Sequence, residues 1–496
     1  MLKESAFIII PIIFPVLMGM ILLAGPQWRD RNKLCLFTGA SLVAAALLVA
    51  GVLAFSGGDI SFTLFSLTKS LPVYFKVDRV GRLFVSAVTV VWLCAGLFSF
   101  EYMKREKKEQ RFYGFYLIVY GVLVGLDFSG NLITFYIFYE LMTLLSMPLV
   151  LHSRTKEAIL AGMKYLFYSF CGAYMALFGL YFLYRYTNTL SFTAGGVLNL
   201  DLVQGREQLL LVVAFLMLAG FGVKAGLFPL HGWLTMAHPV APAPASAVLS
   251  GIIVKGGVLG AIRVVYYLFG PRFLRGTWVQ SVWLALILIT ILMGSMMAYR
   301  EKVWKRRLAY STVSQVSYIL LGVAMMQQDA LQGALLHTVF HACIKCGLFL
   351  VAGAMIYETG KRKVNDYTGI GKSMPVTMGC YTLLSLALIG IPPASGFVSK
   401  WYLAIGSLES GTGFFSVAGP VVLLVSALLT AGYLLPISIR AFLPGEDYDT
   451  AGVVNREPSW KMLLPIMILT VLAVGLGIFA GPLNGIVRQI AELLMK

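Results

Sequence analysis

Six basic side chains lie inside long apolar stretches of this sequence. They are Lys164, Lys224, Lys255, Arg263, Lys345 and Lys400. An ionised group at the centre of a bilayer costs about 2.5–3.5 kcal/mol even on a lenient scale, so such residues face a protein interior or water and mark a pathway. Lys164 and Arg263 lie near the ends of their stretches and can instead extend to the membrane surface. Lys224, Lys255 and Lys400 lie too deep for that, and we expect functional roles for them.

One carboxylate, Glu140, lies in the middle of an apolar segment, FYIFYELMTLLSMPL. Lys224 is its candidate partner. The two side chains either form a pair whose affinity for a proton changes as the lysine moves, or they form a static buried ion pair. A static buried pair contributes little net stability, so the sequence favours a role in moving protons.

Two histidines and a lysine recur every four residues in LLHTVFHACIKCGLFL. His337, His341 and Lys345 therefore share one face of a helix. Histidine titrates near neutral pH and suits a proton relay. A zinc site of the HExxH type needs a glutamate after the first histidine and a third ligand, which this segment lacks. We therefore expect no metal, and we interpret Cys343 and Cys346 as small buried residues.

A neighbouring segment, LAYSTVSQVSYILLG, is rich in hydroxyl and amide groups. Ser314 and Gln315 are its central candidates. These groups either order water between the buried lysines or bond from one helix to another.

Two of the expected membrane segments are interrupted by proline. VKAGLFPLHGWL places Pro229 between Lys224 and His231, and IGIPPASGFVSKW places Pro392 and Pro393 before Lys400. Proline removes a backbone hydrogen bond, and in hydrocarbon the freed groups need protein or trapped water as partners. Packing kinks are one explanation. Two breaks, each beside a buried lysine, favour the discontinuous helices of ion transporters.

The composition supports a membrane protein. The chain has 496 residues, of which 59% are hydrophobic and 12% charged, whereas soluble domains carry about 25% charged residues. Its length accommodates about fourteen spanning helices of about 20 residues. The apolar run from Ala6 lacks a polar cleavage site, which predicts an uncleaved first helix.

The net charge of +17 lies mainly in loops between apolar runs. One set of alternate loops, which includes Lys104 and Arg105, has roughly twice as many Lys and Arg residues as the other set. The positive-inside rule makes the first set cytoplasmic and places both termini outside. We therefore expect a multi-pass protein of a prokaryotic cell membrane and no nucleic-acid partner.

The order of segments predicts an all-α polytopic protein with two inverted five-helix repeats and discontinuous helices 7 and 12. Residues 1–110 hold helices 1–3 and a small extracytoplasmic hairpin near 57–79. Residues 111–270 form the first unit (helices 4–8) and residues 277–443 the second (helices 9–13). Residues 444–496 contain helix 14, expected at 460–485.

The sequence contains no nucleotide-binding glycine pattern, catalytic triad or four-cysteine iron–sulfur motif. We therefore expect no cofactor and no catalytic centre within this chain.

Several segments resemble one known family. They are SFEYM (99–103), the Glu140 segment, KAGLFPLHGWLTMAHPVAPAPASAVLSG (224–251), RRLAYSTVSQ (306–315) and SGFVSKW (395–401). The chain resembles, over nearly its whole length, the antiporter-like proton-translocating subunits shared by respiratory complex I, Mrp-type multisubunit cation/proton antiporters and membrane-bound energy-converting hydrogenases or formate hydrogenlyases. The wording of FEYM and HPVAPAPAS is closer to the hydrogenase and Mrp-type branch.

The resemblance implies fourteen helices and a role for each buried group. Glu140 and Lys224 would serve the first half-channel, Lys255 the central connection and Lys400 the distal half-channel, while His337 and His341 match family histidines. It also implies partners: other membrane subunits and a redox arm, with protons or sodium as the transported ions.

Three functions remain open at this point. The chain is an ion-translocating subunit of a redox-driven complex or of a non-redox Mrp-type antiporter, or it is a stand-alone solute transporter, or it is a redox enzyme that binds a metal or quinone at its histidines.

Overall fold

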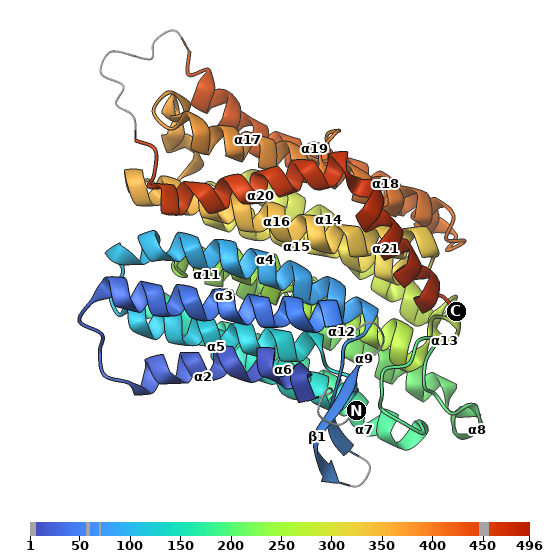
Figure 1. Cartoon of the computed structure of the whole chain (residues 1–496). Coiled ribbons are helices and arrows are strands. Elements are labelled where there is room, and N and C mark those ends of the chain that lie inside the picture. Colours follow the sequence, from blue (N-terminus) through green and yellow to red (C-terminus); the bar gives the residue numbers. More distant parts are fainter. Residues whose placement is uncertain (1–5, 56–59, 69–70, 446–455) are drawn as a thin grey trace.

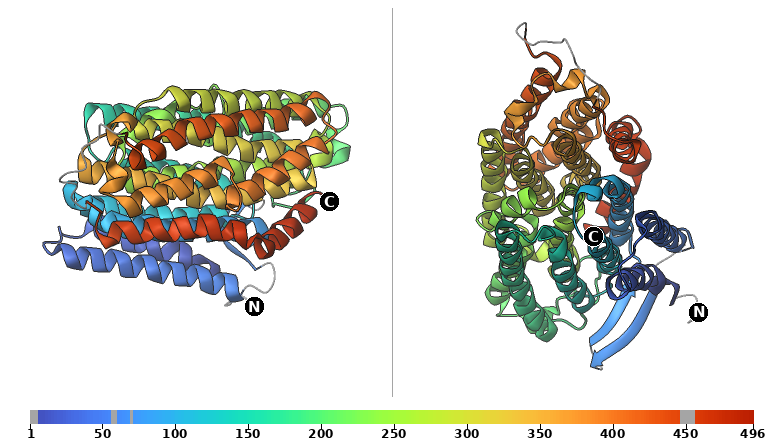
Figure 2. Two further views of the ribbon diagram at one scale, coloured as in Figure 1. Left: turned by 90° about the horizontal axis from the view of Figure 1, so that it is seen from above. Right: turned by 90° about the vertical axis from the view of Figure 1, so that its left-hand side faces the viewer.

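The computed structural model describes residues 6–55, 60–68, 71–445 and 456–496. Long helices lie side by side in one bundle (Figure 1), and the right-hand view of Figure 2 looks roughly along them. Within the described residues, 12 helices are long and apolar enough to cross a membrane. The chain is therefore an all-helical, multi-pass membrane protein.

The first half of the chain forms the lower part of the bundle in Figure 1. Its elements are η1 (Ala6–Ile9), α2 (Ile10–Ala24), α3 (Arg31–Phe55), β1 (Ser61–Thr68), β2 (Leu71–Lys76), α4 (Arg79–Tyr102), η2 (Met103–Arg105), α5 (Glu109–Asp127), α6 (Leu132–Val150), α7 (Lys156–Tyr186), α8 (Leu200–Val203), α9 (Glu207–Ala225), α10 (Gly232–Val240), α11 (Ala243–Val248), the π-helical η3 (Leu249–Ile253), α12 (Lys255–Ile262), the π-helical η4 (Arg263–Phe269) and α13 (Pro271–Leu274).

The second half packs above it in Figure 1, and its last long apolar helix contacts α4. Its elements are α14 (Trp278–Arg300), α15 (Trp304–Met325), α16 (Gln328–Thr359), η5 (Val364–Tyr367), η6 (Ile370–Lys372), α17 (Pro375–Ile389), α18 (Ser395–Leu408), α19 (Phe414–Phe442), α20 (Trp460–Ile478) and α21 (Ala480–Leu494). The helix α16 lies centrally and contacts α4, α11, α15, α18 and α20.

The two ends of the bundle differ. We call the end that carries β1, β2 and the start of α4 the hairpin side. We call the opposite end, which carries η2 and the start of α15, the basic side. The strands pair antiparallel, with Ser61 opposite Lys76, in the region where the sequence predicts a hairpin. Residues 57–59 and 69–70 of that prediction lie outside the described residues.

Side-chain caps set the start of several helices. Asp78 begins α4 by accepting a hydrogen bond from the Gly81 amide at 2.7 Å, and Asn131 begins α6 by accepting one from Thr134 at 2.8 Å. Such caps satisfy amides that lack a partner within the helix. Both caps lie on the hairpin side, and the α6 cap fixes the start of the helix that carries Glu140.

The structure refines the expected helices. The predicted fourteen segments include α5 and the interrupted pair α17 and α18, which are not among the 12 long apolar helices. The last predicted helix, 460–485, is wrong in its extent because it breaks after Ile478 and continues as α21. Pro482 lies just beyond this break, and proline cannot donate the hydrogen bond that would continue the helix.

Candidate functional site

Lys224 lies in the last turn of α9 and is fully buried, at 0% exposure. Its ammonium donates hydrogen bonds to the hydroxyls of Thr143 at 2.7 Å, Tyr165 at 3.0 Å and Ser169 at 3.0 Å. Thr143 lies on α6, and the other two lie on α7. The nitrogen also lies 4.4 Å from the ring centre of Tyr165. Three hydroxyls therefore satisfy all three donors of the ammonium.

Lys224 and Glu140 do not contact each other directly, although each charge acts on the other. The Glu140 carboxylate accepts a hydrogen bond from the Tyr136 hydroxyl at 3.1 Å, and no ion pair within 4.0 Å joins it to Lys224 among the described side chains. Glu140 is half-buried on α6, one turn before Thr143. The lysine contacts the same helix one turn further along, where hydroxyls rather than a carboxylate point inward.

Lys255 begins α12, directly after the π-helical segment η3. Its ammonium contacts the Gly251 carbonyl and lies 2.9 Å from Nδ1 of His341. Both groups are buried. This contact joins the end of the chain's first half to α16, on the helical face that His337 and His341 share.

His337 continues the connection along α16. Its ring centre lies 5.8 Å from that of His341, and its Nδ1 lies 2.9 Å from Oγ of Ser399 on α18. Tyr318 of α15 stacks on His337 with ring centres 5.7 Å apart. The two histidines therefore bridge from Lys255 to the residue that precedes Lys400.

Lys400 lies beside the break between α17 and α18. Its ammonium donates to the carbonyls of Leu388 at 2.6 Å and Ile389 at 2.8 Å. The last carbonyls of a helix have no partner within it, and a cation at a helix C-terminus is favourable. The interruption at Pro392 and Pro393 thus creates the oxygens that hold this lysine.

Lys345 points away from this line, toward the basic side. Its ammonium donates to the Leu308 carbonyl at 3.2 Å. His238, at the end of α10, is also fully buried, and its ring stacks on Phe349 with centres 4.6 Å apart. Neither ring nitrogen of His238 has a partner among the described residues. His238 was not among the residues expected to lie in the site, although its place next to the proline-rich segment could have indicated it.

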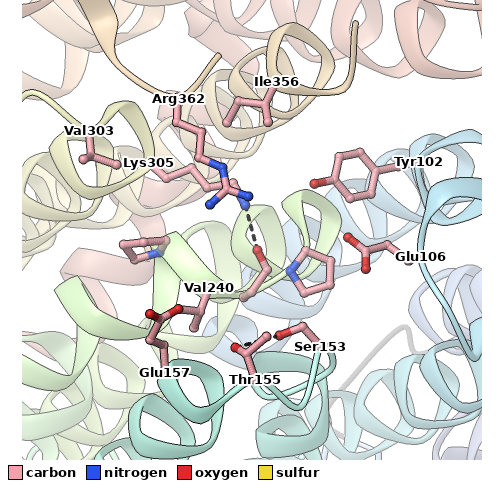
Figure 3. A pocket seen from close by; sticks show the side chains of 13 residues that line it. Tyr102, Glu106, Ser153, Thr155, Glu157, Val240, Val303, Lys305, Ile356 and Arg362 are labelled. Carbon is pink, nitrogen blue, oxygen red and sulfur yellow. Dashed lines mark hydrogen bonds between the residues drawn. The ribbon is translucent and has the colours of Figure 1, made fainter. Parts of the chain in front are cut away.

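A cavity of about 330 Å³ opens near these groups on the basic side. Figure 3 shows Lys305 and Arg362 facing into it, with Glu106 and Glu157 on its walls. The Lys305 ammonium donates to the Ala241 carbonyl at 2.7 Å. Ala241 follows α10, so the floor of the cavity adjoins the helix that carries His238.

The sequence left two roles open for the hydroxyl and amide groups of α15, which are to order water or to bond between helices. The structure gives Ser314 and Gln315 different surroundings. Ser314 bonds across helices, to Ser295 at 2.8 Å and Ser426 at 3.2 Å. Gln315 is fully buried, yet neither polar atom of its amide has a partner in the part of the chain that the structure describes. Ser314 is thus a packing residue, whereas Gln315 presents free polar atoms to the interior.

The remaining candidates lie at the periphery. Lys164 is exposed on α7, with its nitrogen 3.4 Å from the Met236 sulfur. His231 is partly buried and stacks on Phe228, and Pro229 is exposed at the end of the first half-helix.

The sequence allowed Arg263 to extend to the membrane surface. In the structure it is only 1% exposed and does not do so. It makes a two-armed contact with Asp78 and lies 4.6 Å and 4.5 Å from the ring centres of Phe192 and Tyr267.

Comparisons with known proteins identify the family of the chain. The transmembrane family described as NADH:quinone oxidoreductase/Mrp antiporter matches residues 129–430, and the N-terminal family of complex I chain 5 matches residues 65–113. The chain belongs to this antiporter-like family.

Its relatives come from several kinds of complex. The chain is 35% identical to a subunit of NADH-quinone oxidoreductase from Desulforudis audaxviator, over 81% of each chain. It is 28% identical to a Na(+)/H(+) antiporter subunit from Bacillus subtilis, over 99% of this chain and 97% of the relative. It is 31% identical to a hydrogenase-4 component from Escherichia coli, over 84% of this chain and 64% of the relative.

Solved structures share the fold over the whole length. A chain of the Mrp complex from Dietzia sp. superposes with a TM-score of 0.86 at 22% identity, covering 100% of this chain and 98% of that one. A chain of respiratory complex I from Thermus thermophilus gives 0.78 at 22% identity, covering 98% and 99%.

Proposed function

We propose that this chain is a proton-translocating, or sodium/proton-exchanging, subunit of a multisubunit energy-converting membrane complex in which a redox reaction of partner subunits drives ion movement. It has no catalytic centre of its own in this proposal. Its membrane is the prokaryotic cell membrane, with the basic side in the cytoplasm and both termini outside, in keeping with the positive-inside rule.

One observation carries the proposal: a line of buried titratable groups crosses from the first half of the chain to the second. Lys255 contacts His341, His337 follows one turn away, and Ser399 adjoins Lys400. A neutral histidine accepts a proton at one nitrogen and releases one from the other. The line can therefore pass a proton without movement of the backbone.

Unpartnered buried atoms extend this line. Nε2 of His337, Nε2 of His341 and both amide atoms of Gln315 have no partner among the described residues. Buried polar atoms in proteins are normally bonded to protein or ordered water. Water molecules bonded to these atoms would complete a continuous route between Lys255 and Lys400.

The basic side offers the route its access from solution. The cavity is lined by Lys305 and by Pro239, the residue after His238, and the charged groups that act on His238 are Lys305 and Lys345. Lys345 lies on α16, one turn beyond His341. We therefore place the cytoplasmic entrance there.

The position of Glu140 is an argument that this chain lies against another subunit. It lies in the middle of α6 and its side chain is only partly buried. A carboxylate facing lipid at that depth is costly, so a neighbouring subunit is its natural cover. We assign Glu140 to the exchange of protons at that contact, and Glu140→Gln is expected to stop coupled ion movement while the complex still assembles.

A non-redox Mrp-type antiporter is the second candidate. The Bacillus subtilis relative matches this chain nearly end to end. Purification of the complex decides between the two, because redox-enzyme partners and purely membrane partners are distinguished by the subunits that co-purify.

The central test replaces Lys255 with Met in the whole complex and measures ion pumping in vesicles together with complex abundance. The expected result is abundant complex that pumps at least about tenfold less, because the proton carrier between the halves is gone. Lys302→Met, an exposed lysine on the basic side, is the matched control. Normal pumping by Lys255→Met would refute the proposed route.

A further inference from the structure

A groove lies on the hairpin side, between the two halves of the chain. Its volume is about 640 Å³, and its lining comes mainly from α4, α16, α20 and α21. Figure 1 shows α21 leaving the line of α20 and crossing this end of the bundle. Leu483, Ile486 and Ile490 of α21 line the groove, and their three- and four-residue spacing places them on one helical face. The break after Ile478 therefore gives the groove one of its walls.

The other walls of the groove are also largely apolar. Leu472 and Leu476 of α20, Val339 of α16 and Val90 of α4 line them. The protein itself does not cover these walls, because the Val90 side chain is 38% exposed and that of Ile486 is 56% exposed. An apolar surface of this kind needs a lipid or another chain to cover it.

The end of the groove at the start of α4 is positively charged. The charged residues that line it are Arg79 and Arg82, both in the first turn of α4. Cations in this turn oppose the helix dipole, so helix stability does not explain them. Asp78, the acid next to them in the sequence, is held by Arg263 through a two-armed contact. Arg79 is exposed and forms no ion pair within 4.0 Å with any described residue. An anion bound here would balance this charge.

The length of the groove fits one leaflet of a membrane. Arg79 and Val90 both line it, and they lie about 16 Å apart along α4 at about 1.5 Å per residue. The hydrocarbon core of a bilayer is about 30 Å thick, so the groove reaches from the end of a spanning helix to about the middle of the membrane, as the acyl chain of one lipid does. A helix of a partner subunit is about 10 Å across and crosses the whole membrane, so it would lie over the groove instead of filling it.

We propose that the groove binds an anionic phospholipid, with its phosphate on Arg79 and Arg82 and an acyl chain along the apolar walls. Arginine binds phosphate through paired hydrogen bonds, and basic pockets between membrane helices bind anionic lipid headgroups. A zwitterionic phospholipid offers the same phosphate but brings its own cation, which the two arginines repel. The site therefore selects lipids with a net negative charge. This inference goes beyond the proposed function, because lipid binding is measured without ion pumping.

The test counts the lipids on the purified complex by native mass spectrometry. The complex is stripped of lipid in detergent and then given phosphatidylglycerol or phosphatidylcholine. The wild type is expected to retain one phosphatidylglycerol more than the double variant Arg79→Gln, Arg82→Gln, and to bind phosphatidylcholine at this site at least about tenfold more weakly. Arg488→Gln removes an exposed arginine of α21 that does not line the groove. It is the matched control and is expected to retain the lipid.

A second variant tests the acyl-chain part of the site and leaves the arginines in place. Val90→Trp fills the groove from an exposed position, so the packed core is undisturbed, and the variant is expected to lose the same phosphatidylglycerol. Val43→Trp, at an exposed position of α3 outside the groove, is its control. An excess of inorganic phosphate should not displace the lipid, because phosphate has no acyl chain.

Retention of the lipid at the wild-type level by either variant overturns the inference, and Val90→Trp decides alone if the arginine variant does not assemble. Displacement of the lipid by inorganic phosphate would mean a simple anion site and also overturns it. Ile486→Cys in the lipid-free complex should react with a maleimide. If it gains no reactivity over the wild type, a partner subunit covers the groove and the inference is wrong.

Discussion

The two interrupted helices hold their lysines in different ways. Lys224 lies before the break, at the end of α9, and three hydroxyls on α6 and α7 bind it. Lys400 lies after the break, in α18, and two carbonyls at the end of α17 bind it. The first half of the chain thus surrounds its cation with side chains, and the second half with backbone.

The difference has a chemical meaning. A hydroxyl both donates and accepts hydrogen bonds and can rotate, whereas a carbonyl only accepts. The partners of Lys224 can therefore adapt when the lysine gains or loses a proton. The two carbonyls hold the Lys400 ammonium in one fixed place. The proton that Lys400 releases is therefore the one on its third N–H group, which the carbonyls do not bind, and we expect Ser399 and His337 to be its acceptors.

Removing either cation is the severest test of this comparison. Lys224→Met and Lys400→Met are each expected to reduce pumping to background, because both sites lose the group that carries the proton. Pumping in vesicles and complex abundance are the measurements, and Lys302→Met is the control. A normal rate in either variant would exclude that broken helix from the route.

Charge reversal sharpens the comparison. In Lys224→Glu a carboxylate can accept hydrogen bonds from the same hydroxyls, so the variant should assemble. In Lys400→Glu an ionised carboxylate would face the Leu388 and Ile389 carbonyls, and only the protonated acid can donate to them. We therefore expect partial pumping that is greater at acidic than at alkaline pH. If Lys400→Glu assembles better than Lys224→Glu at alkaline pH, the proposed difference between the two lysine sites is wrong.

The glycines that end the two first half-helices allow a finer test. Gly226 and Gly390 have φ of +82° and +93°, and alanine at either costs about 1–2 kcal/mol from backbone strain. A Cβ at position 390 would lie 2.9 Å from Cδ of Lys400, whereas one at 226 would lie 3.4 Å from Val313. Both variants should lower the melting temperature similarly, but only Gly390→Ala should slow pumping, by several-fold. Equal pumping by both would show that the position of Lys400 is not critical.

The smallest expected effect is the energetic coupling between Glu140 and Lys224. Because the two charges act on each other without a direct ion pair, a double-mutant cycle with Glu140→Gln and Lys224→Met should give a coupling energy of unfolding of about 0.5–1 kcal/mol, at the low end of the range for interacting residues. The cycle is measured by thermal unfolding of the purified complex. A coupling of several kcal/mol would mean that the two side chains meet in another conformation of the protein.

The sequence predicts much of this site because two physical signals are strong. Charges within apolar segments identify Lys224, Lys255 and Lys400 as interior, and a four-residue spacing places His337 and His341 on one helical face. Prolines predict where helices are interrupted. These signals depend on local spacing and on the cost of burying charge, both of which are properties of the sequence alone.

Which side chains contact each buried lysine depends on how the helices pack, and the sequence does not show this. Spacing fixes which residues share a face but not how far one helix slides along another, so the sequence paired Lys224 with Glu140 instead of with hydroxyls one turn away. Asp127 and Arg263 lie near the ends of their segments, where charges usually meet water. Only the packing of α4 against α5 and η4 shows that both are buried.

The carbonyls at the end of α17 bear on ion selectivity. Broken helices in other transporters use such unwound carbonyls to coordinate sodium. Here the carbonyls of Leu388 and Ile389 bind the Lys400 ammonium, so the chain's own side chain occupies that point whenever it is protonated. A sodium ion would have to displace a covalently attached competitor, whereas a proton needs only to bind to it. We therefore expect the second broken helix to favour protons over alkali metal ions.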